Sequence, residues 1–508
     1  MPTDCFALIA LPPLLVTCCL GTGIVSGMIA GEAGERITAR FALGGAILSW
    51  LLALSALLVK TNAGFADQLV LGTWLHSGDY HVDLSFRLDY LGSIMALLVS
   101  TLGLLTLKFS VDYMHREPGF HRFFLVMTLF VGAMLLLVTA GNAVLTFVGW
   151  ELAGVCSYLL IAYAYDRPNA AAGATRAFVT NRIGDAGFML GIFLCQIWFG
   201  SVEWDSIVKA ALRLSDWQVG MLAGCFLLAA MAKSGQVPFA PWLARAIEGP
   251  TPSSAIFYGA IMVHAGVYLI LRLEPVFSQS PVSMVLMMVV GALTAFYGWY
   301  GGLTQTDVKS ALIFSTSAQI GLMFVEAGLG WWQLAQWHLV AHACVMAYQF
   351  LSAPSLMHQL QGIQPRAVPS WLGRVRFLYL ASLQRLWLET LGDRIAVHPI
   401  QEIAADLQAF DAQFVDPAFG TPAGQLQALE MSEPTRHVLH ASGLAGSLLL
   451  KTANGLHWFE ERLVLQGLGE NLVRTGRHWG VRLNYLEDLM GRPRYLIAFI
   501  LITLMLAA

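Results

Sequence analysis

Charged residues are scarce in this chain. Of its 508 residues, 57% are hydrophobic and only 12% are Asp, Glu, Lys or Arg, whereas a soluble domain usually carries about twice that charged fraction. So few charges could not cover the surface of a soluble protein of this size, and the mean hydropathy of +0.64 agrees. The net charge of −3 gives no electrostatic reason to expect a polyanionic partner. Soluble enzymes, nucleic-acid binders and disordered scaffolds are therefore excluded, and a polytopic membrane protein is predicted.

Cysteine motifs are also missing. The seven cysteines stand in apolar stretches, and none forms a Cys-x-x-Cys or a Cys/His pair with metal-ligand spacing, so they are interpreted as small buried hydrophobic side chains. No flavin or iron–sulfur motif is visible. We therefore expect no cofactor in this chain and no enzymatic activity of its own. The apolar residues 1–20 lack a basic leading segment, which predicts a membrane helix rather than a signal peptide.

Apolar runs long enough to cross a bilayer, roughly 20 residues each, recur about eleven times before position 356. The sequence thus predicts an all-α fold, a polytopic membrane helix bundle with a broken seventh helix and with amphipathic C-terminal helices. The approximate spans are 5–30, 41–60, 89–110, 121–140, 141–164, 177–199, 219–236, 253–273, 282–303, 308–328 and 331–354.

The composition changes near residue 355. Charged residues make up about 10% of residues 1–355 and about 18% of 356–492. The second stretch has amphipathic patterns broken by prolines, which favours helices lying on the membrane or on a partner subunit. We therefore predict a transmembrane domain over 1–355, a surface-associated helical region over 356–492 that docks a soluble or peripheral partner, and a C-terminal hydrophobic helix over 493–508.

Ionisable residues inside apolar spans cost several kcal/mol each and tend to be paired and functional. Glu151 lies near the centre of the fifth predicted span. Arg182 and Asp185 stand three residues apart in the sixth, so they share a helix face and can pair. The alternative for this pair is a solvated helix end.

Lys233 follows an apolar run in the seventh span. A desolvated lysine gives up its proton readily, so it can act as a reversible proton carrier. Pro238 and Pro241 come within two turns and should break the helix, leaving backbone carbonyl groups free near the lysine. The alternative is a lysine that snorkels from the helix end to water.

Four further ionisable residues stand on later spans. His264 is in mid-span, and histidine is the residue type that ordinarily accepts and passes on protons near neutral pH. Lys309 stands near the start of the tenth span. His338 and His342 share a face of the eleventh; they could ligate a metal, but no third ligand has a recognisable spacing. A lone histidine of this kind can also be a hydrogen-bonded structural group. Together with Glu151, the series predicts a proton or cation relay in the plane of the membrane.

The motifs around these residues resemble the antiporter-like proton-translocating subunits shared by respiratory complex I and Mrp-type cation antiporters. The resemblance covers roughly residues 85–355. It rests on Phe147-Val-Gly-Trp-Glu151, Cys156-Ser-Tyr-Leu-Leu-Ile161, Asn181-Arg-Ile-Gly-Asp185, Ala232-Lys-Ser-Gly-Gln236, Glu248-Gly-Pro-Thr-Pro-Ser-Ser-Ala255, Met262-Val-His-Ala-Gly-Val-Tyr-Leu269 and His338-Leu-Val-Ala-His-Ala343.

The resemblance implies that Glu151 and Lys233 form the central pair of a proton channel. Two departures stand out: Met346 occupies a position where the family usually has lysine, and Tyr258 stands where a histidine is expected. The further spans of complex I subunits, with a second broken helix, have no counterpart after residue 355.

A shorter architecture of this kind resembles the membrane subunit of two-component, DAB-type inorganic-carbon pumps. That resemblance implies a subunit of the bacterial cytoplasmic membrane that conducts protons or Na⁺ and supplies ion-gradient energy to a zinc-containing, carbonic-anhydrase-like partner for CO2/bicarbonate uptake. The alternatives are a proton-pumping subunit of a complex I-like NADH:quinone oxidoreductase or hydrogenase, an Mrp-type cation/proton antiporter subunit, and a structural subunit with a decayed channel.

Overall fold

The computed structural model describes residues 8–60, 67–78, 80–359 and 367–411. By packing, the chain divides into two units, residues 1–399 and 400–508. The predicted helix over 493–508, and the part of the predicted 356–492 region from residue 412 onward, lie outside the described residues.

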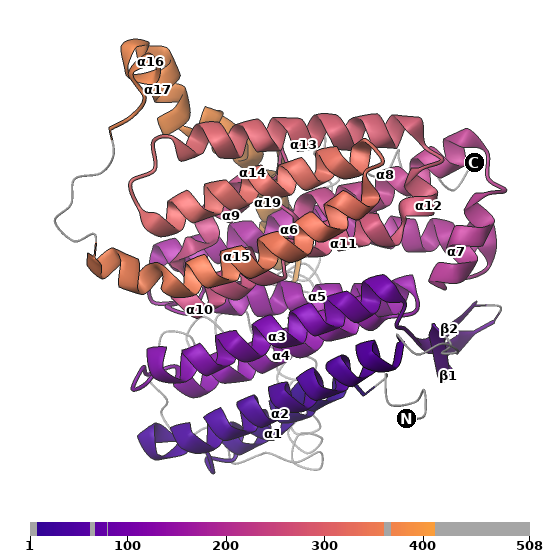
Figure 1. Ribbon diagram of the computed structural model, residues 1–508, viewed down its shortest axis with the longest axis horizontal. Coiled ribbons are helices and arrows are strands. Elements are labelled where there is room, and N and C mark those ends of the chain that lie inside the picture. The colour runs from indigo at the N-terminus through magenta and orange to yellow at the C-terminus, as the bar shows by residue number, and fades with distance from the viewer. Residues whose placement is uncertain (1–7, 61–66, 79, 360–366, 412–508) are drawn as a thin grey trace, which may run out of the picture. The chain divides into compact units, whose positions relative to one another are not determined.

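The first unit is a bundle of α-helices, which confirms the predicted fold class (Figure 1). Among the described residues, seven helices are long and apolar enough to cross a membrane, namely α2 to α6, α13 and α14. The longer helices are α1 (Leu11–Val25), α2 (Gly31–Lys60), α3 (Tyr90–Tyr113), α4 (Phe120–Thr139), α5 (Ala143–Ile161), α6 (Pro168–Phe199), α8 (Asp216–Lys233), α13 (Pro281–Gly302), α14 (Val308–Gly328) and α15 (Trp332–Gln359). The shorter ones are α7 (Trp204–Ala211), α9 (Pro241–Arg245), α10 (Thr251–Ser254), α11 (Ala265–Arg272), α12 (Glu274–Phe277), α16 (Ser370–Arg374), α17 (Arg376–Leu383) and α18 (Leu388–Gly392). Most residues of α19 (His398–Phe410) belong to the second unit.

Local sequence signals set several helix starts. The side chains of Asp89, Asn142 and Asp307 accept hydrogen bonds from backbone N–H groups three residues further on, at the starts of α3, α5 and α14. Such caps satisfy backbone donors that a helix leaves without a partner. Pro168 and Pro281 stand in the first turns of α6 and α13, where proline costs no hydrogen bond.

Small residues let neighbouring helices approach closely. A Cβ added at Gly149 of α5 would lie 2.7 Å from backbone atoms of α4, and one at Gly298 of α13 would lie 2.4 Å from the backbone N of Ala318 in α14. Since the hydrophobic effect is weak between helices in lipid, association depends on this kind of close packing. Figure 1 shows the bundle extending from α1 and α2 on one side to α13 on the other.

Two helices of the bundle are interrupted. The predicted break in the seventh span is confirmed, because α8 ends at Lys233 and α9 begins at Pro241. The eighth span is also broken, which the sequence analysis did not predict. There α10 continues into a π-helical segment, Ala255–Ala260, followed by a turn that ends at His264, and α11 then starts at Ala265.

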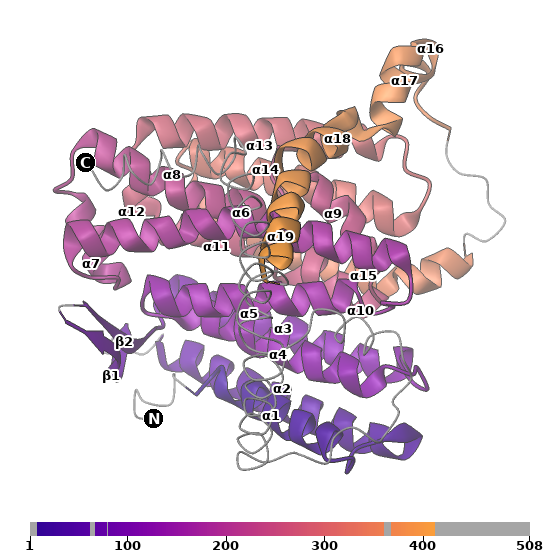
Figure 2. The ribbon, with the colours of Figure 1, turned by 180° about the vertical axis from the view of Figure 1, so that it is seen from behind.

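A β-hairpin, also not predicted, stands beside one end of the bundle (Figure 2). Its antiparallel strands are β1 (Gln68–Ser77) and β2 (Tyr80–Arg87). Gly78 in the connecting turn has a φ of +58°, which glycine adopts at no steric cost. The signal was present in the sequence, since apolar side chains alternate at Val82, Leu84 and Phe86.

Candidate functional site

Ionisable side chains from three helices meet inside the bundle, and we call Glu151, Arg182, Asp185 and Lys233 the acid–base cluster. Arg182 of α6 forms ion pairs with Glu151 of α5 and, at 2.8 Å between Nη2 and Oδ2, with Asp185 of its own helix. The alternative of a solvated helix end does not hold, because α6 already begins at Pro168 and the Asp185 side chain is only 6% exposed.

Lys233 is fully buried at the end of α8, so the snorkelling alternative is also excluded. Its Nζ donates a hydrogen bond to the backbone O of Trp150 at 2.9 Å and lies 4.9 Å from the centroid of that indole ring. The indole N–H of Trp150 donates to Oδ1 of Asp185 at 2.7 Å. Trp150 therefore links Lys233 to Asp185, while Glu151 pairs with Arg182 rather than with Lys233. Trp150 belongs to a motif of the sequence, but no role was predicted for its side chain.

Gly154 has no side chain, and the cationic groups of Arg182 and Lys233 lie in the space beside it. A Cβ at this position would lie 3.4 Å from Nη2 of Arg182 and 3.4 Å from Nζ of Lys233. Both cationic groups thus reach the same stretch of α5, one turn after Trp150.

A hydrogen bond joins the two sides of the helix break that follows Lys233. Pro238 lies in the loop, and Pro241 takes the first position of α9. Free carbonyl groups were expected here, but the indole N–H of Trp242 donates to the carbonyl O of Ala232 at 2.9 Å. The second half of the broken helix is thereby tied to the residue just before the lysine.

The histidines form a second cluster at the break in the eighth helix. Nε2 of His264 and Nδ1 of His342 lie 2.8 Å apart, and both residues are buried. A neutral imidazole has one donor and one acceptor nitrogen, so such a pair can pass a proton. The two helix breaks adjoin each other, because Ser234, the residue after Lys233, donates a hydrogen bond to the carbonyl O of Val263 at 2.6 Å.

His338 contacts two residues of α14 that the sequence analysis missed. Its Nδ1 lies 2.9 Å from Oε1 of Glu326, and its Nε2 lies 3.0 Å from Oε1 of Gln319. Glu326 was detectable, since it is an acid within the tenth predicted span. Within the described ranges, no three His, Cys, Asp or Glu side chains are grouped as a metal site would need.

Lys309 does not join the histidines. It stands in the first turn of α14, and the helical rise of 1.5 Å per residue places Glu326 about 25 Å away along the same helix. Lys309 instead lines a cavity of about 440 Å³ that Glu248 also lines. The structure therefore separates it from the group to which the sequence analysis assigned it.

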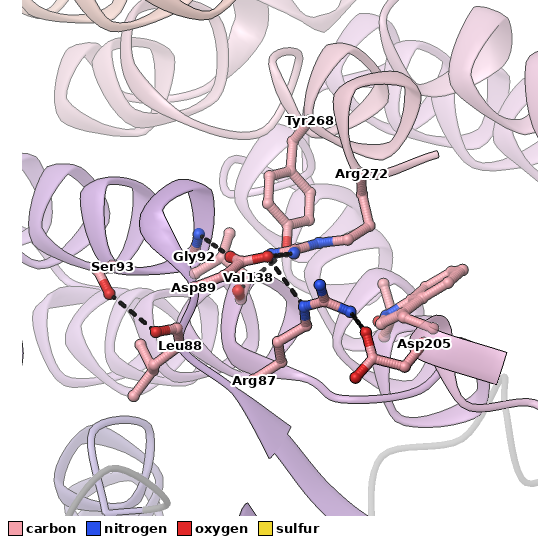
Figure 3. Close-up of polar contacts among 11 residues, drawn as sticks. Arg87, Leu88, Asp89, Gly92, Ser93, Val138, Asp205, Tyr268 and Arg272 are labelled. Carbon is pink, nitrogen blue, oxygen red and sulfur yellow. Dashed lines mark hydrogen bonds and ion pairs between the residues drawn. The ribbon is translucent and has the colours of Figure 1, made fainter. Parts of the chain in front are cut away.

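A third polar network, not predicted, joins α11 to the end of the hairpin (Figure 3). Arg272 is buried and forms an ion pair with Asp89, and its Nη2 donates to the hydroxyl of Tyr268 at 3.0 Å. Arg87 of β2 pairs with both Asp89 and Asp205. Burial alone would raise the pKa of Asp89, but the positive charge of Arg272 lowers it to about 2. Because the charges balance, this network is interpreted as a clamp between the hairpin and the bundle.

The comparisons with known proteins identify the family of the chain. Residues 140–368 match the family model described as NADH:quinone oxidoreductase/Mrp antiporter, TM, and residues 74–124 match the one described as NADH-Ubiquinone oxidoreductase (complex I), chain 5 N-terminus. The chain belongs to this antiporter-like family. The acid–base cluster and both histidine-bearing helices lie within the first matched range.

Two curated relatives illustrate the similarity. NAD(P)H-quinone oxidoreductase chain 5 of Synechocystis sp. is 37% identical over 362 residues, which are 70% of this chain and 53% of the relative. NADH-quinone oxidoreductase subunit L of Mycobacterium tuberculosis is 43% identical over 293 residues, 57% of this chain and 46% of the relative. The antiporter-like chain thus spans about half the length of the curated relatives it matches.

Solved structures show the same fold at lower identity. The Mrp complex from Dietzia sp. contains a chain with a TM-score of 0.62 at 20% identity, covering 98% of this chain and 62% of that one. Respiratory complex I from Thermus thermophilus gives a TM-score of 0.59 at 19% identity, covering 70% and 71%. These names agree better with the complex I and Mrp alternatives than with the carbon-uptake function expected first.

Proposed function

We propose that this antiporter-like subunit translocates protons across a membrane as one part of a multi-subunit complex of the complex I or Mrp type. The observation that carries the proposal is the acid–base cluster, which gathers a fully buried lysine, an arginine and two carboxylates inside a helix bundle. Buried charges in a membrane are costly and mark ion pathways when they are retained.

The cluster holds a proton through its charge balance. Glu151 and Asp185 are matched by Arg182 and by the protonated Lys233, so the four charges cancel. When Lys233 releases its proton, one negative charge is left in excess in a region where charge interactions are poorly screened. That excess negative charge favours protonation of the lysine by the next proton. Lys233 can therefore release and bind protons repeatedly.

The histidine cluster supplies the continuation of the pathway. Lys233 and His264 are neighbours of Ser234 and Val263, the two residues that join the helix breaks. From His264 a proton passes to His342 by direct hydrogen bonding, and His338 follows one turn away with Glu326 as its acidic partner. The pathway therefore crosses the bundle at the level where both helices are interrupted.

The test is proton flux in liposomes that contain the full chain and an enclosed pH-sensitive dye. Lys233→Ala and Glu151→Gln are each expected to reduce flux about 10²-fold or more, as loss of a proton-transferring group does. Lys108→Ala, which removes an exposed lysine of α3, is the matched control and should leave flux unchanged. Full flux in the Lys233→Ala variant would refute the proposal.

The identity of the complex is tested by co-purification. Quinone-reductase or cation/proton antiporter subunits are the expected partners, in keeping with the names of the relatives. The zinc-containing, carbonic-anhydrase-like partner of the carbon-uptake hypothesis remains a prediction. Recovery of such a protein, with zinc bound, would replace the complex I or Mrp assignment by that one.

A further inference from the structure

The segment that follows the family match lies across the break in the seventh helix. The matched range ends at residue 368, and the chain then forms α16, α17 and α18. We call residues 376–393 the strap. Any role of the strap in proton transfer rests on the proposed function.

The first part of the strap is fixed to α13. The hydroxyl of Tyr300 donates to the carbonyl O of Leu378 at 2.6 Å, and the hydroxyl of Ser382 donates to the carbonyl O of Tyr300 at 2.7 Å. The hydroxyls of Thr304 and Ser382 lie 3.1 Å apart. These bonds anchor α17, so the residues after it start from a defined position.

A tight turn then directs the strap onto the broken helix. Arg385, Leu386 and Trp387 all have φ between +52° and +56°, a conformation that side-chain-bearing residues rarely adopt and that surrounding contacts must hold. Leu386 packs against the apolar cluster that includes Ala240 and Ala244 of the broken helix. The turn therefore places an apolar side chain on the very segment that lacks a continuous helix.

Two acidic residues of the strap also form ion pairs with arginines of α6 and α9. Glu389 accepts hydrogen bonds from Arg245, the last residue of α9, and from Arg176 of α6. Asp393 pairs with the same Arg176. Pro238 lines a small cavity together with both acids. Glu389 thus joins the second half of the broken helix to the long, continuous α6.

The second half of the broken helix needs such contacts. A helix of five residues has almost no stability of its own, because nucleation is unfavourable, so its position is set by what it touches. Arg245 ends this helix, and Trp242 within it donates to Ala232, the residue before Lys233. A shift of α9 would reach Lys233 through this hydrogen bond.

We propose that Glu389 is a positioning residue for proton transfer: by holding Arg245 against α6, the strap fixes α9 and with it the surroundings of Lys233. Glu389 does not carry the proton itself. Loosening the strap is expected to lower the transfer rate, because misplacement of a reacting group by about 1 Å can cost up to about 10²-fold.

The experiment combines two measurements on the full chain in lipid nanodiscs and liposomes. Amide hydrogen exchange over residues 237–248 reports the order of the broken helix, and dye-detected flux reports proton transfer. Glu389→Gln removes the charge at nearly constant shape and is expected to raise exchange in this segment about tenfold and to lower flux about tenfold. Glu389→Asp keeps the charge and should restore part of both.

Two further variants control the result. Arg245→Gln breaks the same contact from the other side, at a side chain that is 55% exposed and therefore tolerant of change, and should reproduce the effect of Glu389→Gln. Glu32→Gln, a change on α2, breaks an exposed ion pair with Arg116 and should change neither measurement.

The outcomes separate the two proposals. Unchanged exchange over 237–248 in both Glu389→Gln and Arg245→Gln would show that the strap does not fix α9. Raised exchange with unaltered flux would overturn the positioning role. If Lys233→Ala conducts normally, the proposed function fails, while the exchange measurement still decides whether the strap holds the broken helix.

Discussion

The charge of Asp89 is expected to stabilise the folded bundle, and its substitution by asparagine isolates this effect. Asp89 has two roles: it pairs with the buried Arg272, and its Oδ1 accepts a hydrogen bond from the backbone N–H of Gly92 at 2.8 Å, which caps α3. Asparagine caps helices about as well as aspartate. Asp89→Asn therefore removes the charge and keeps the cap, whereas Asp89→Ala removes both.

The magnitude follows from the pKa and from burial. A pKa of about 2 for Asp89, against its ordinary value near 4, corresponds to about 2–3 kcal/mol in favour of the ionised form. Removing the charge also leaves the guanidinium of Arg272, whose side chain is 3% exposed, without its acidic partner, and breaking a buried pair costs about 3–5 kcal/mol. Since Tyr268 still contacts Arg272, we expect a loss of about 3 kcal/mol for Asp89→Asn. Loss of the cap should add about 1 kcal/mol in Asp89→Ala.

The pH dependence has a defined sign. Because the pKa of Asp89 is lower in the folded state than in the unfolded chain, its stabilisation is complete at neutral pH. It is lost as the pH falls from about 4 towards about 2. Wild type should therefore lose more stability than Asp89→Asn over this interval.

The assay is thermal unfolding of the full chain in detergent, at pH 7 and at pH 3. Asp307→Asn is the matched control, because Asp307 caps α14 in the same way at an exposed position. The expected order of midpoints at pH 7 is wild type and Asp307→Asn, then Asp89→Asn, then Asp89→Ala. Equal midpoints for wild type and Asp89→Asn at pH 7 would refute the reasoning.

The remaining predictions concern the proton pathway. Trp150→Phe removes the N–H that binds Asp185 but keeps the backbone acceptor for Lys233, so proton flux should fall about tenfold without loss of folding, and an unchanged flux would remove Trp150 from the pathway. Glu326→Gln removes the carboxylate that contacts Nδ1 of His338, so proton flux should fall about tenfold, and an unchanged flux would remove Glu326 from the pathway.

Much of the fold could be predicted because each membrane span has its own signal in the sequence, a run of apolar residues. Each span must be apolar over its own length, so residues such as those of α4 and α13 identify their helices without reference to any neighbour. The break after Lys233 was predictable for a similar reason, since Pro238 and Pro241 interrupt a helix through their own backbone geometry, whatever surrounds them. The hairpin was missed because its alternating residues are few and lie between two far stronger apolar signals.

Residues of the candidate site were predicted from the sequence, but the pairs that they form were not. Glu151, Arg182 and Lys233 were identifiable because a charge in an apolar run is costly wherever it points. Which charges meet was not identifiable. Arg182 rather than Lys233 pairs with Glu151, and Lys309 stands about 25 Å from Glu326 along α14.

The sequence by itself determined that this protein is a helical membrane bundle with a few ionisable side chains inside it, because both properties depend on composition over short windows. Only the tertiary structure decided that Trp150 bridges lysine and aspartate, that the eighth helix breaks beside the seventh, and that Glu389 reaches Arg245 from far along the chain. These contacts depend on rotation and depth of helices relative to one another. Close packing at glycines fixes both quantities, and no local window of sequence contains them.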